Sequence, residues 1–278
     1  LIGVDLMSDV VTSLRTILPE RDDFHSVGVD HQRVSQMIAD GYTGNKGKGG
    51  FYRRGPNGRE VQDILTDGNK LVWRQINTSL LDAVQRSAEA DARNDDPLGP
   101  VLDDNSTAAR YAKRVLVRIL SYAASLVPAI THSPQDIDDA MKLGFNWQRG
   151  PFEMIDAIGS ERFASLCGEC GLSVPDILAD GSPTYSVSQR QLLVRHAGGS
   201  RHPVNLPDGV MRFSLTRRTL TPVLSNDAAS LFALEGNLRL IEFHSKANAL
   251  TDESMQIVAA AAKDHGAGII VHNDAQHF

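Results

Sequence analysis

Apolar residues recur at intervals of three and four along much of the chain, which is the spacing of one buried face of an α-helix. The pattern is strongest over residues 109–126, where it predicts a helix long enough to form the centre of a bundle. The same spacing predicts shorter helices at residues 7–18, 34–38, 152–158 and 161–170. Residues 61–92 are expected to form one or two further helices with their charged side chains on the outer face.

One predicted helix carries a clear start signal. Ser133 is expected to be its N-cap, Pro134 fits the first helical position, and Asp136 adds negative charge to the first turn, where the helix dipole favours it. Ile137, Ala140 and Met141 are expected to be its buried stripe.

The pattern changes after Asp180. Clusters of Gly, Pro and Ser predict a linker over residues 181–226. Residues 231–234 and 238–243 then predict a β-hairpin, followed by a helix at 252–263 and an apolar strand at 268–272. We expect the sheet of this β-β-α-β segment to be uncovered and mobile, with unpaired strand edges.

The helical part contains a loosely repeated pattern. Leu1-Ile2-Gly3 matches Ala157-Ile158-Gly159, which places residue 1 inside a repeat, so we expect the chain to be a fragment of a longer protein. We therefore divide it into a truncated first helical repeat, connecting helices, a second helical repeat, the linker and the C-terminal segment, with bounds at 1–55, 56–105, 106–180, 181–226 and 227–278.

Composition narrows the classes of partner and location. The chain has 278 residues, 41% of them hydrophobic, which is enough for a sizeable core. Its net charge of -6 provides no general basic surface for nucleic acid, so none is expected as a partner. No apolar run reaches the roughly 18 residues that a membrane span needs. Two cysteines are too few for a disulfide-built secreted domain, which indicates the cytoplasm.

Residues 43–52 form a glycine-rich segment with two lysines, which suggests a cradle for phosphate. The spacing does not fit either phosphate-binding motif. Gly50 stands where a P-loop needs lysine, and Tyr52 stands where a dinucleotide fingerprint needs its last glycine. The favoured interpretation is a tight turn that docks Phe51 and Tyr52 onto a helical core.

The remaining motifs have weak chemical signals. Cys167 and Cys170 have the spacing of zinc and redox sites, but no second pair is present, so we expect two half-buried thiols on one helix and no metal site. The nine histidines match no hydrolytic motif. Residues 246–250, between a predicted strand and a predicted helix, are placed to contact a nucleotide or a thioester tail.

Taken together, two segments resemble known families. Residues 136–141, 144–146 and 150–159, with the Gly49-Gly50-Phe51-Tyr52 ending of the first repeat, resemble the helical C-terminal domain of 3-hydroxyacyl-CoA dehydrogenases. Residues 242–250 and 268–278 resemble the opening of an enoyl-CoA hydratase/isomerase (crotonase) domain. A dehydrogenase joined to a hydratase is an arrangement of fused β-oxidation proteins.

The resemblance implies a mainly α fold of helical repeats like the C-terminal domain of 6-phosphogluconate dehydrogenase, ending in the β-β-α-β segment. It implies NAD as the cofactor and a CoA thioester as the substrate of an oxidation of 3-hydroxyacyl-CoA to 3-oxoacyl-CoA. The family's Rossmann domain and its catalytic His-Glu pair would precede Leu1, so no residue of this chain is expected to be catalytic.

The resemblance also gives roles to particular residues. Lys246, Ala247 and Ala249 match the segment that lies along CoA in the crotonase family. The residues of the shared helical motif are expected to be structural, namely Gly49, Gly50, Phe51, Tyr52, Gly150, Pro151, Phe152, Asp156 and Gly159. Arg114 matches the arginine of the family's Asn-Arg pair, whereas Lys113 replaces the asparagine, so the second repeat is expected to be structural as well.

In that family the helical domains form a dimer interface, so we expect a homodimer or pseudo-twofold packing of residues 1–55 against 106–180. Two alternatives remain. One is a non-catalytic helical scaffold or dimerisation module, which would bind neither CoA nor acyl-CoA. The other is a different NAD-dependent dehydrogenase with a similar helical domain, which residues 246–250 disfavour.

Overall fold

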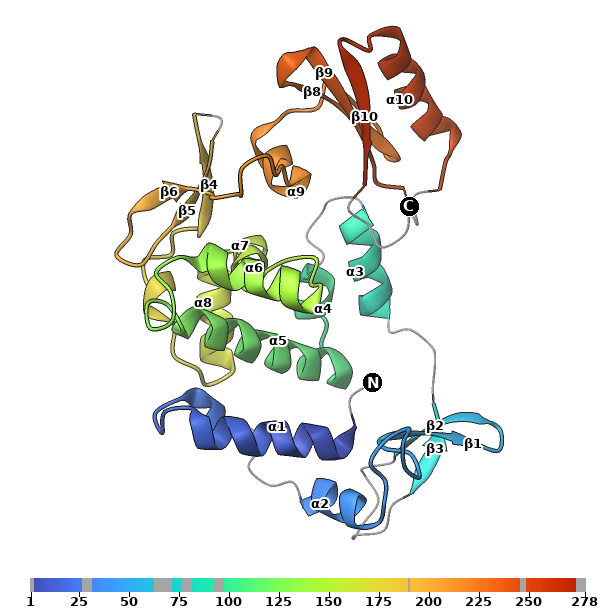
Figure 1. The fold of residues 1–278 in the computed structure, drawn as a ribbon, viewed down its shortest axis with the longest axis vertical. Helices are drawn as coiled ribbons and strands as arrows, with labels where there is room; N and C mark the ends of the chain where they lie inside the picture. Colours follow the sequence, from blue (N-terminus) through green and yellow to red (C-terminus); the bar gives the residue numbers. More distant parts are fainter. Residues whose placement is uncertain are drawn as a thin grey trace. The chain divides into compact units, whose positions relative to one another are not determined.

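A computed structural model describes residues 3–26, 32–62, 72–76, 82–92, 98–189, 191–245 and 249–273 (Figure 1). The chain divides into two compact units, residues 1–80 and 81–278. Each unit has its own hydrophobic core. The five-part division inferred from the sequence, and the packing of residues 1–55 against 106–180, stay predictions.

The first unit combines two helices with a small antiparallel sheet of order β1-β2-β3. Its elements are α1 (Val4–Ile17), the 3-10 helix η1 (Asp23–Ser26), α2 (Gln32–Ala39), β1 (Tyr52–Gly55), β2 (Gly58–Gln62) and β3 (Trp73–Gln75). Val4 of α1 and Val34 and Met37 of α2 form its buried core, on which Phe51 packs. The two predicted helices are therefore confirmed.

The prediction of one or two helices over residues 61–92 is wrong for residues 61–62 and 73–75, which belong to strands. Residues 82–92 are helical as predicted, and residues 63–71 and 77–81 lie outside the described part of the chain. The turn Gly55-Pro56-Asn57-Gly58 explains the difference, because glycine, proline and asparagine favour a tight hairpin turn and the chain then pairs as a strand.

The second unit is built around a group of helices (Figure 1). These are α3 (Asp82–Ala92), α4 (Gly99–Leu102), α5 (Thr107–Ser125), α6 (Pro134–Phe145), α7 (Pro151–Ile158), α8 (Ser160–Glu169) and the 3-10 helix η2 (Asp176–Leu178). The long helix α5 contributes Val117 and Leu120 to the core, and α7 and α8 contribute Phe152, Ile155 and Phe163, all without exposed surface. The sequence prediction of α5, α6, α7 and α8 is confirmed.

Helix α6 begins at Pro134 after Ser133, as predicted, but its buried face differs from the expected one. Ala140 is exposed, whereas Gln135 and Asp138 are buried. This face can be polar because each of these two side chains has hydrogen-bond partners in neighbouring elements.

Residues 181–226, predicted as a linker, contain a second antiparallel sheet and short helices. These are β4 (Tyr185–Ser188), β5 (Gln191–Arg195), β6 (Arg201–Pro203), α9 (Phe213–Thr216) and the 3-10 helix η3 (Arg217–Thr219). Tyr185, Leu192 and Val194 are buried in the same core as α5 and α7. The sequence prediction missed this sheet because its strands have only three to five residues and glycine-rich or proline-rich turns surround them.

The C-terminal segment has the predicted β-β-α-β order in β8 (Ala229–Leu234), β9 (Leu238–Phe243), α10 (Asp252–Lys263) and β10 (Gly268–His272), with the 3-10 helix η4 (Glu235–Asn237) between β8 and β9. The short strand β7 (Leu224–Ser225) precedes this segment and pairs with β8. The sheet order is β10-β9-β8-β7, with β10 parallel to β9 and the other pairs antiparallel.

The expectation that this sheet is uncovered is wrong. Ile257 of α10 packs on one face with Leu231 and Ile241. On the other face, Phe213 of α9 packs against Phe232 and Leu240. Leu215, two residues after Phe213, is buried in the helical core, so α9 joins the C-terminal sheet to the helices. Over the residues that the structure describes, the fold is thus mixed and not mainly α, with three small sheets beside the predicted helices.

Candidate functional site

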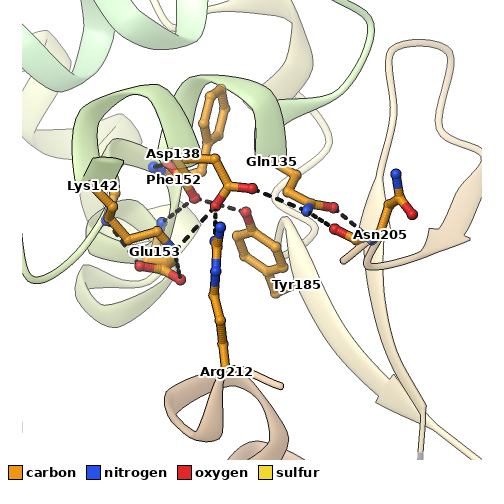
Figure 2. Close-up of polar contacts among 10 residues, drawn as sticks. Gln135, Asp138, Lys142, Phe152, Glu153, Tyr185, Asn205 and Arg212 are labelled. Atoms are coloured by element: carbon orange, nitrogen blue, oxygen red, sulfur yellow. Dashed lines mark hydrogen bonds and ion pairs between the residues drawn. The ribbon is translucent and has the colours of Figure 1, made fainter. Parts of the chain in front are cut away.

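The side chain of Asp138 connects three elements of the second unit (Figure 2). It projects from α6 and has no exposed surface. Its Oδ1 accepts the backbone N–H of Phe152 at 2.8 Å, and its Oδ2 accepts the hydroxyl of Tyr185 at 2.8 Å. The N–H of Glu153 lies 3.3 Å from Oδ2. One carboxyl group therefore joins α6, the first turn of α7 and strand β4.

Gly150 allows α7 to start this close to Asp138. A Cβ atom at position 150 would lie 2.3 Å from the Cβ and Cγ of Asp138. Pro151 then occupies the first helical position, where no N–H is needed, and the following N–H groups of α7 point to the carboxyl group. The Gly150-Pro151-Phe152 motif thus provides space, a helix start and a core anchor.

A layer of ionic groups surrounds the Asp138 contacts (Figure 2). The Nζ of Lys142 lies 2.8 Å from Oε1 of Glu153, whose Oε2 accepts the N–H of Gly150 at 2.9 Å. Arg212 forms an ion pair with Asp139, and the Nζ of Lys142 lies 3.8 Å from the same carboxylate. These pairs join α6 to α7 and to the segment before α9.

A polar contact at the start of α6 reaches the segment after β6. The side-chain oxygen of Gln135 accepts the backbone N–H of Asn205 at 2.9 Å, and its side-chain nitrogen donates to the carbonyl of the same residue. The side-chain amide of Gln135 therefore pairs with both backbone groups of Asn205, as the peptide groups of a neighbouring β-strand would.

Burial dominates the protonation of this cluster. It raises the pKa of Asp138 to about 7, the negative charge of Glu153 acts in the same direction, and the hydrogen bond from the N–H of Phe152 opposes them. Burial and the nearby Asp138 raise the pKa of Tyr185 above its ordinary value. Tyr185 therefore stays a hydrogen-bond donor at neutral pH. Asp138 is buried among its hydrogen-bond partners, so its role is to hold α6, α7 and β4 together.

The remaining residues of the second motif also have structural positions. The Oδ1 and Oδ2 of Asp156 accept the N–H groups of Thr184 and Tyr185 at 2.8 and 2.7 Å, which fixes the start of β4 to α7. Burial raises the pKa of Asp156. Gly159 has a φ of +89°, a conformation that side chains disfavour, and lies between α7 and α8.

The first copy of the motif is only partly as expected. Gly44 and Gly49 pair across a tight turn, and Phe51 packs on the core of the first unit, as predicted. The docking of Tyr52 onto that core is wrong, because Tyr52 is 54% exposed on β1. Side chains alternate between the two faces of a strand, so adjacent aromatic residues there face opposite ways.

The expected CoA contacts stay a prediction. Lys246 and Ala247 lie outside the described residues. Ala249 follows them, and its carbonyl accepts the hydroxyl of Ser245 at 2.7 Å.

Cys167 and Cys170 are not disulfide-bonded, and burial raises the pKa of the Cys167 thiol. Within the described ranges, His, Cys, Asp and Glu form no group of three that could hold a metal ion. Of the helices that the structure describes, none is both long enough and apolar enough to cross a membrane.

Sequence reasoning missed Tyr185, Gln135 and Asn205 as members of this cluster. Tyr185 and Asn205 lie in the segment predicted as a linker, 47 and 70 residues from their partners. Local spacing has no signal for contacts at such a distance. Asp138 did lie in the motif that carried the family resemblance, but its hydrogen bonds were not predicted.

Comparison with known proteins supports the family resemblance for the helical part. Residues 111–175 match the family model for the C-terminal domain of 3-hydroxyacyl-CoA dehydrogenase. This match covers most of α5, all of α6 to α8, and every structural residue predicted in the second motif.

Distant relatives match over most of the chain. A protein of Bacillus subtilis described as a 3-hydroxyacyl-CoA dehydrogenase is 25% identical over 88% of this chain and 31% of its own length. Trifunctional enzymes of the fatty acid oxidation complex from Rickettsia prowazekii and Rickettsia felis are 24% and 26% identical over the whole chain and 35% of their own length. The chain thus spans about a third of these relatives. No solved structure matches significantly. Residues 111–175 are therefore similar to the C-terminal domain of 3-hydroxyacyl-CoA dehydrogenase, and the chain as a whole is distantly similar to enzymes of fatty acid oxidation.

Proposed function

We propose that the chain is the helical part of an NAD-dependent 3-hydroxyacyl-CoA dehydrogenase of fatty acid oxidation. The whole enzyme would oxidise a 3-hydroxyacyl-CoA to a 3-oxoacyl-CoA. The observation that carries this proposal is the match of α5 to α8 to the C-terminal domain of that family. The names of the relatives from Bacillus and Rickettsia support the same reaction class.

The described residues do not form the strand-turn-helix motif that binds NAD. A dinucleotide site needs a strand, a glycine-rich turn and a helix that starts at the pyrophosphate. The glycine-rich turn of this chain follows α2 and leads into β1. Its N–H groups at Gly44 and Gly47 already donate to carbonyl groups of the same turn, so they are not available to a phosphate. We therefore assign the NAD site and the proton-transfer residues to other parts of the whole protein.

In this proposal the helical unit forms one wall of the acyl-CoA cleft and a dimer-like core. A wall that positions a thioester must keep its helices in fixed register, because small displacements of a bound group reduce reaction rates strongly. The contacts of Asp138 with α7 and β4, and of Asp156 with β4, provide such fixation. These side chains act on helix positions and not on the reacting atoms.

We further propose that residues 227–278 belong to an enoyl-CoA hydratase/isomerase part fused to the dehydrogenase. The β-β-α-β order of β8, β9, α10 and β10 supports this assignment, as does the description of the Rickettsia relatives as trifunctional. Lys246, Ala247 and Ala249 would contact CoA there.

The alternative is a non-catalytic scaffold. One observation favours it, since both oxygens of Asp138 and both of Asp156 already accept hydrogen bonds from within the second unit. Groups that are satisfied in this way contribute rigidity and do not recognise a ligand.

Isothermal titration of the 278-residue chain with acetoacetyl-CoA and with free CoA separates the two functions. The dehydrogenase proposal predicts heat with acetoacetyl-CoA and tighter binding of it than of CoA, because only the former carries the acyl group that the helical wall would contact. An absence of heat with both compounds would favour the scaffold. Equal affinities for acetoacetyl-CoA and free CoA would mean that the chain contacts only the CoA part, and this result would contradict the proposed wall of an acyl-CoA cleft.

A further inference from the structure

The small sheet of the first unit has two chemically different faces. Strand pairing places Arg53 opposite Glu60 and Gln62 opposite Trp73. These four side chains share the inner face, where Arg53 forms an ion pair with Glu60 at 2.7 Å and its guanidinium lies 4.2 Å from the centre of the Trp73 ring. Gln62 is buried there, and Trp73 stacks on Tyr42. The charged and aromatic side chains of this face therefore already have partners within the first unit.

The outer face carries a concentrated positive charge. Tyr52 pairs with Val61, Arg54 with Arg59, and Val61 with Arg74, so these residues point to the same side of the sheet. Tyr52 and the three arginines are exposed. No acidic residue is among the strand residues of this face, which we call the arginine face and define as Tyr52, Arg54, Arg59, Val61 and Arg74. Arg74 already has an interaction within the chain, so Arg54 and Arg59 carry the charge that a ligand would meet.

The position of two of these arginines opposes stability. Arg54 and Arg59 lie directly opposite each other, and like charges in that position destabilise a strand pair. Residues 44–62 and 72–76 contain six Lys and Arg against one Glu, in a chain whose net charge is -6. Folding of the sheet does not explain this arrangement, whereas a bound anion would offset the repulsion.

We propose that the arginine face binds a nucleotide that carries a diphosphate. The planar guanidinium groups of Arg54 and Arg59 are suited to hold phosphate oxygens in pairs of hydrogen bonds. Tyr52 offers an exposed ring on which a base can stack, and Arg59 already lies 5.8 Å from its centre. Tyr52 and Arg54 are two residues apart on β1, about 6.5 Å along the strand, so a base and its phosphates can reach both side chains.

A nucleic acid fits this surface less well than a small nucleotide. Proteins that bind the nucleic acid backbone commonly contact about 6–10 phosphates. The arginine face has three arginines, and the net negative charge of the chain repels a long polyanion. The proposal is also separate from the proposed function, since it depends on β1 to β3 alone.

Isothermal titration with ADP, adenosine and inorganic pyrophosphate tests the proposal on the full chain. We expect ADP to bind more tightly than either of its parts, with an affinity that falls as salt is raised. Replacement of both arginines, R54Q/R59Q, should weaken ADP binding by about a hundredfold, because each charge-assisted contact contributes about tenfold. The matched control R21Q/R110Q removes two exposed arginines elsewhere and should leave ADP binding unchanged.

Thermal unfolding distinguishes a ligand site from a structural role. ADP should raise the Tm of the wild-type chain and not that of R54Q/R59Q. Without ligand, the Tm of R54Q/R59Q should equal or exceed that of the wild type, because a repulsion has been removed. Equal binding of ADP and pyrophosphate, equal loss in R21Q/R110Q, or no binding of ADP by the wild type would overturn the proposal. The preference for acetoacetyl-CoA over CoA should survive in R54Q/R59Q, so the two proposals can fail separately.

Discussion

Among the glycines of residues 107–171, Gly150 is the one at which an added Cβ would meet another side chain, that of Asp138. The backbone of residue 150 lies against the carboxyl group of Asp138, and the N–H groups that follow it donate to that group. A side chain at position 150 would therefore have to displace a buried group that holds three elements together.

Replacement of this glycine by alanine is predicted to destabilise the second unit by about 3 kcal/mol. This value combines overpacking with the loss of hydrogen bonds to a buried carboxyl group. Urea unfolding followed by circular dichroism measures it. The matched control is G144A in α6, where an added Cβ meets nothing within 4 Å and alanine should stabilise the helix by about 0.5–1 kcal/mol. Similar effects of G150A and G144A would contradict the described contact.

Asp138 is predicted to make stability depend on pH below neutrality. Burial raises its pKa from 3.8 to about 7, so the fold favours the protonated form. Its contribution to stability is therefore fully present below pH 3.8 and is lost as pH rises to about 7. The rise of the pKa from 3.8 to about 7 corresponds to a change of about 4 kcal/mol in the free energy of unfolding. Urea unfolding at a series of pH values measures it.

The D138N variant provides the reference for that series. Asparagine cannot change its charge, so the free-energy difference between wild type and D138N should shrink or reverse between pH 4 and pH 7 and stay constant above pH 8. A difference that grows with pH would mean that the fold favours ionised Asp138 and would contradict the raised pKa.

At the level of elements, the sequence predicted helices far better than strands. The long helix α5 and the start of α6 at Pro134 followed from apolar spacing and end signals. The three strands β4 to β6 did not, because each is short and their buried residues, Tyr185, Leu192 and Val194, are held by contacts with distant helices. Conversely, β8 and β9 are six residues each and directly adjacent, and their hairpin was predicted correctly.

Within the candidate site, too, features with local sequence signals were predicted and features that depend on distant contacts were not. Gly150, Pro151 and Phe152 were recognisable as a loop-to-helix joint, because glycine and proline have local conformational meaning. The buried face of α6 was predicted only in part. Ile137 packs against the core as expected, whereas Gln135 and Asp138 were missed because they are polar and only their distant partners make their burial favourable.

The attachment of β4 to α7 is predicted to depend on Asp156. In D156A the N–H groups of Thr184 and Tyr185 lose their acceptors, and an unsatisfied buried donor costs about 1–3 kcal/mol. Hydrogen exchange in β4 and β5 should become faster, while exchange in α5 stays slow. The D176A variant, which removes an exposed carboxylate at the start of η2, should leave β4 and β5 unchanged. Unaltered exchange in D156A would show that other contacts hold the sheet.

At the scale of the whole molecule, the two units differ in what they contribute. The first unit has a small core around Met37 and presents the arginine face. The second unit has a larger helical core, and α9 connects it to the C-terminal sheet through Leu215 and Phe213. No change in composition marks the division between residues 80 and 81, which falls within the predicted connecting segment 56–105.

The proposed recognition of an acyl-CoA by the helical unit can be measured by hydrogen exchange of the 278-residue chain, followed by mass spectrometry with and without saturating acetoacetyl-CoA. If the helices bind the thioester, exchange should become slower in peptides from α5 to α8, which are similar to the dehydrogenase domain. Slower exchange confined to residues 52–62, or no change anywhere, would contradict it.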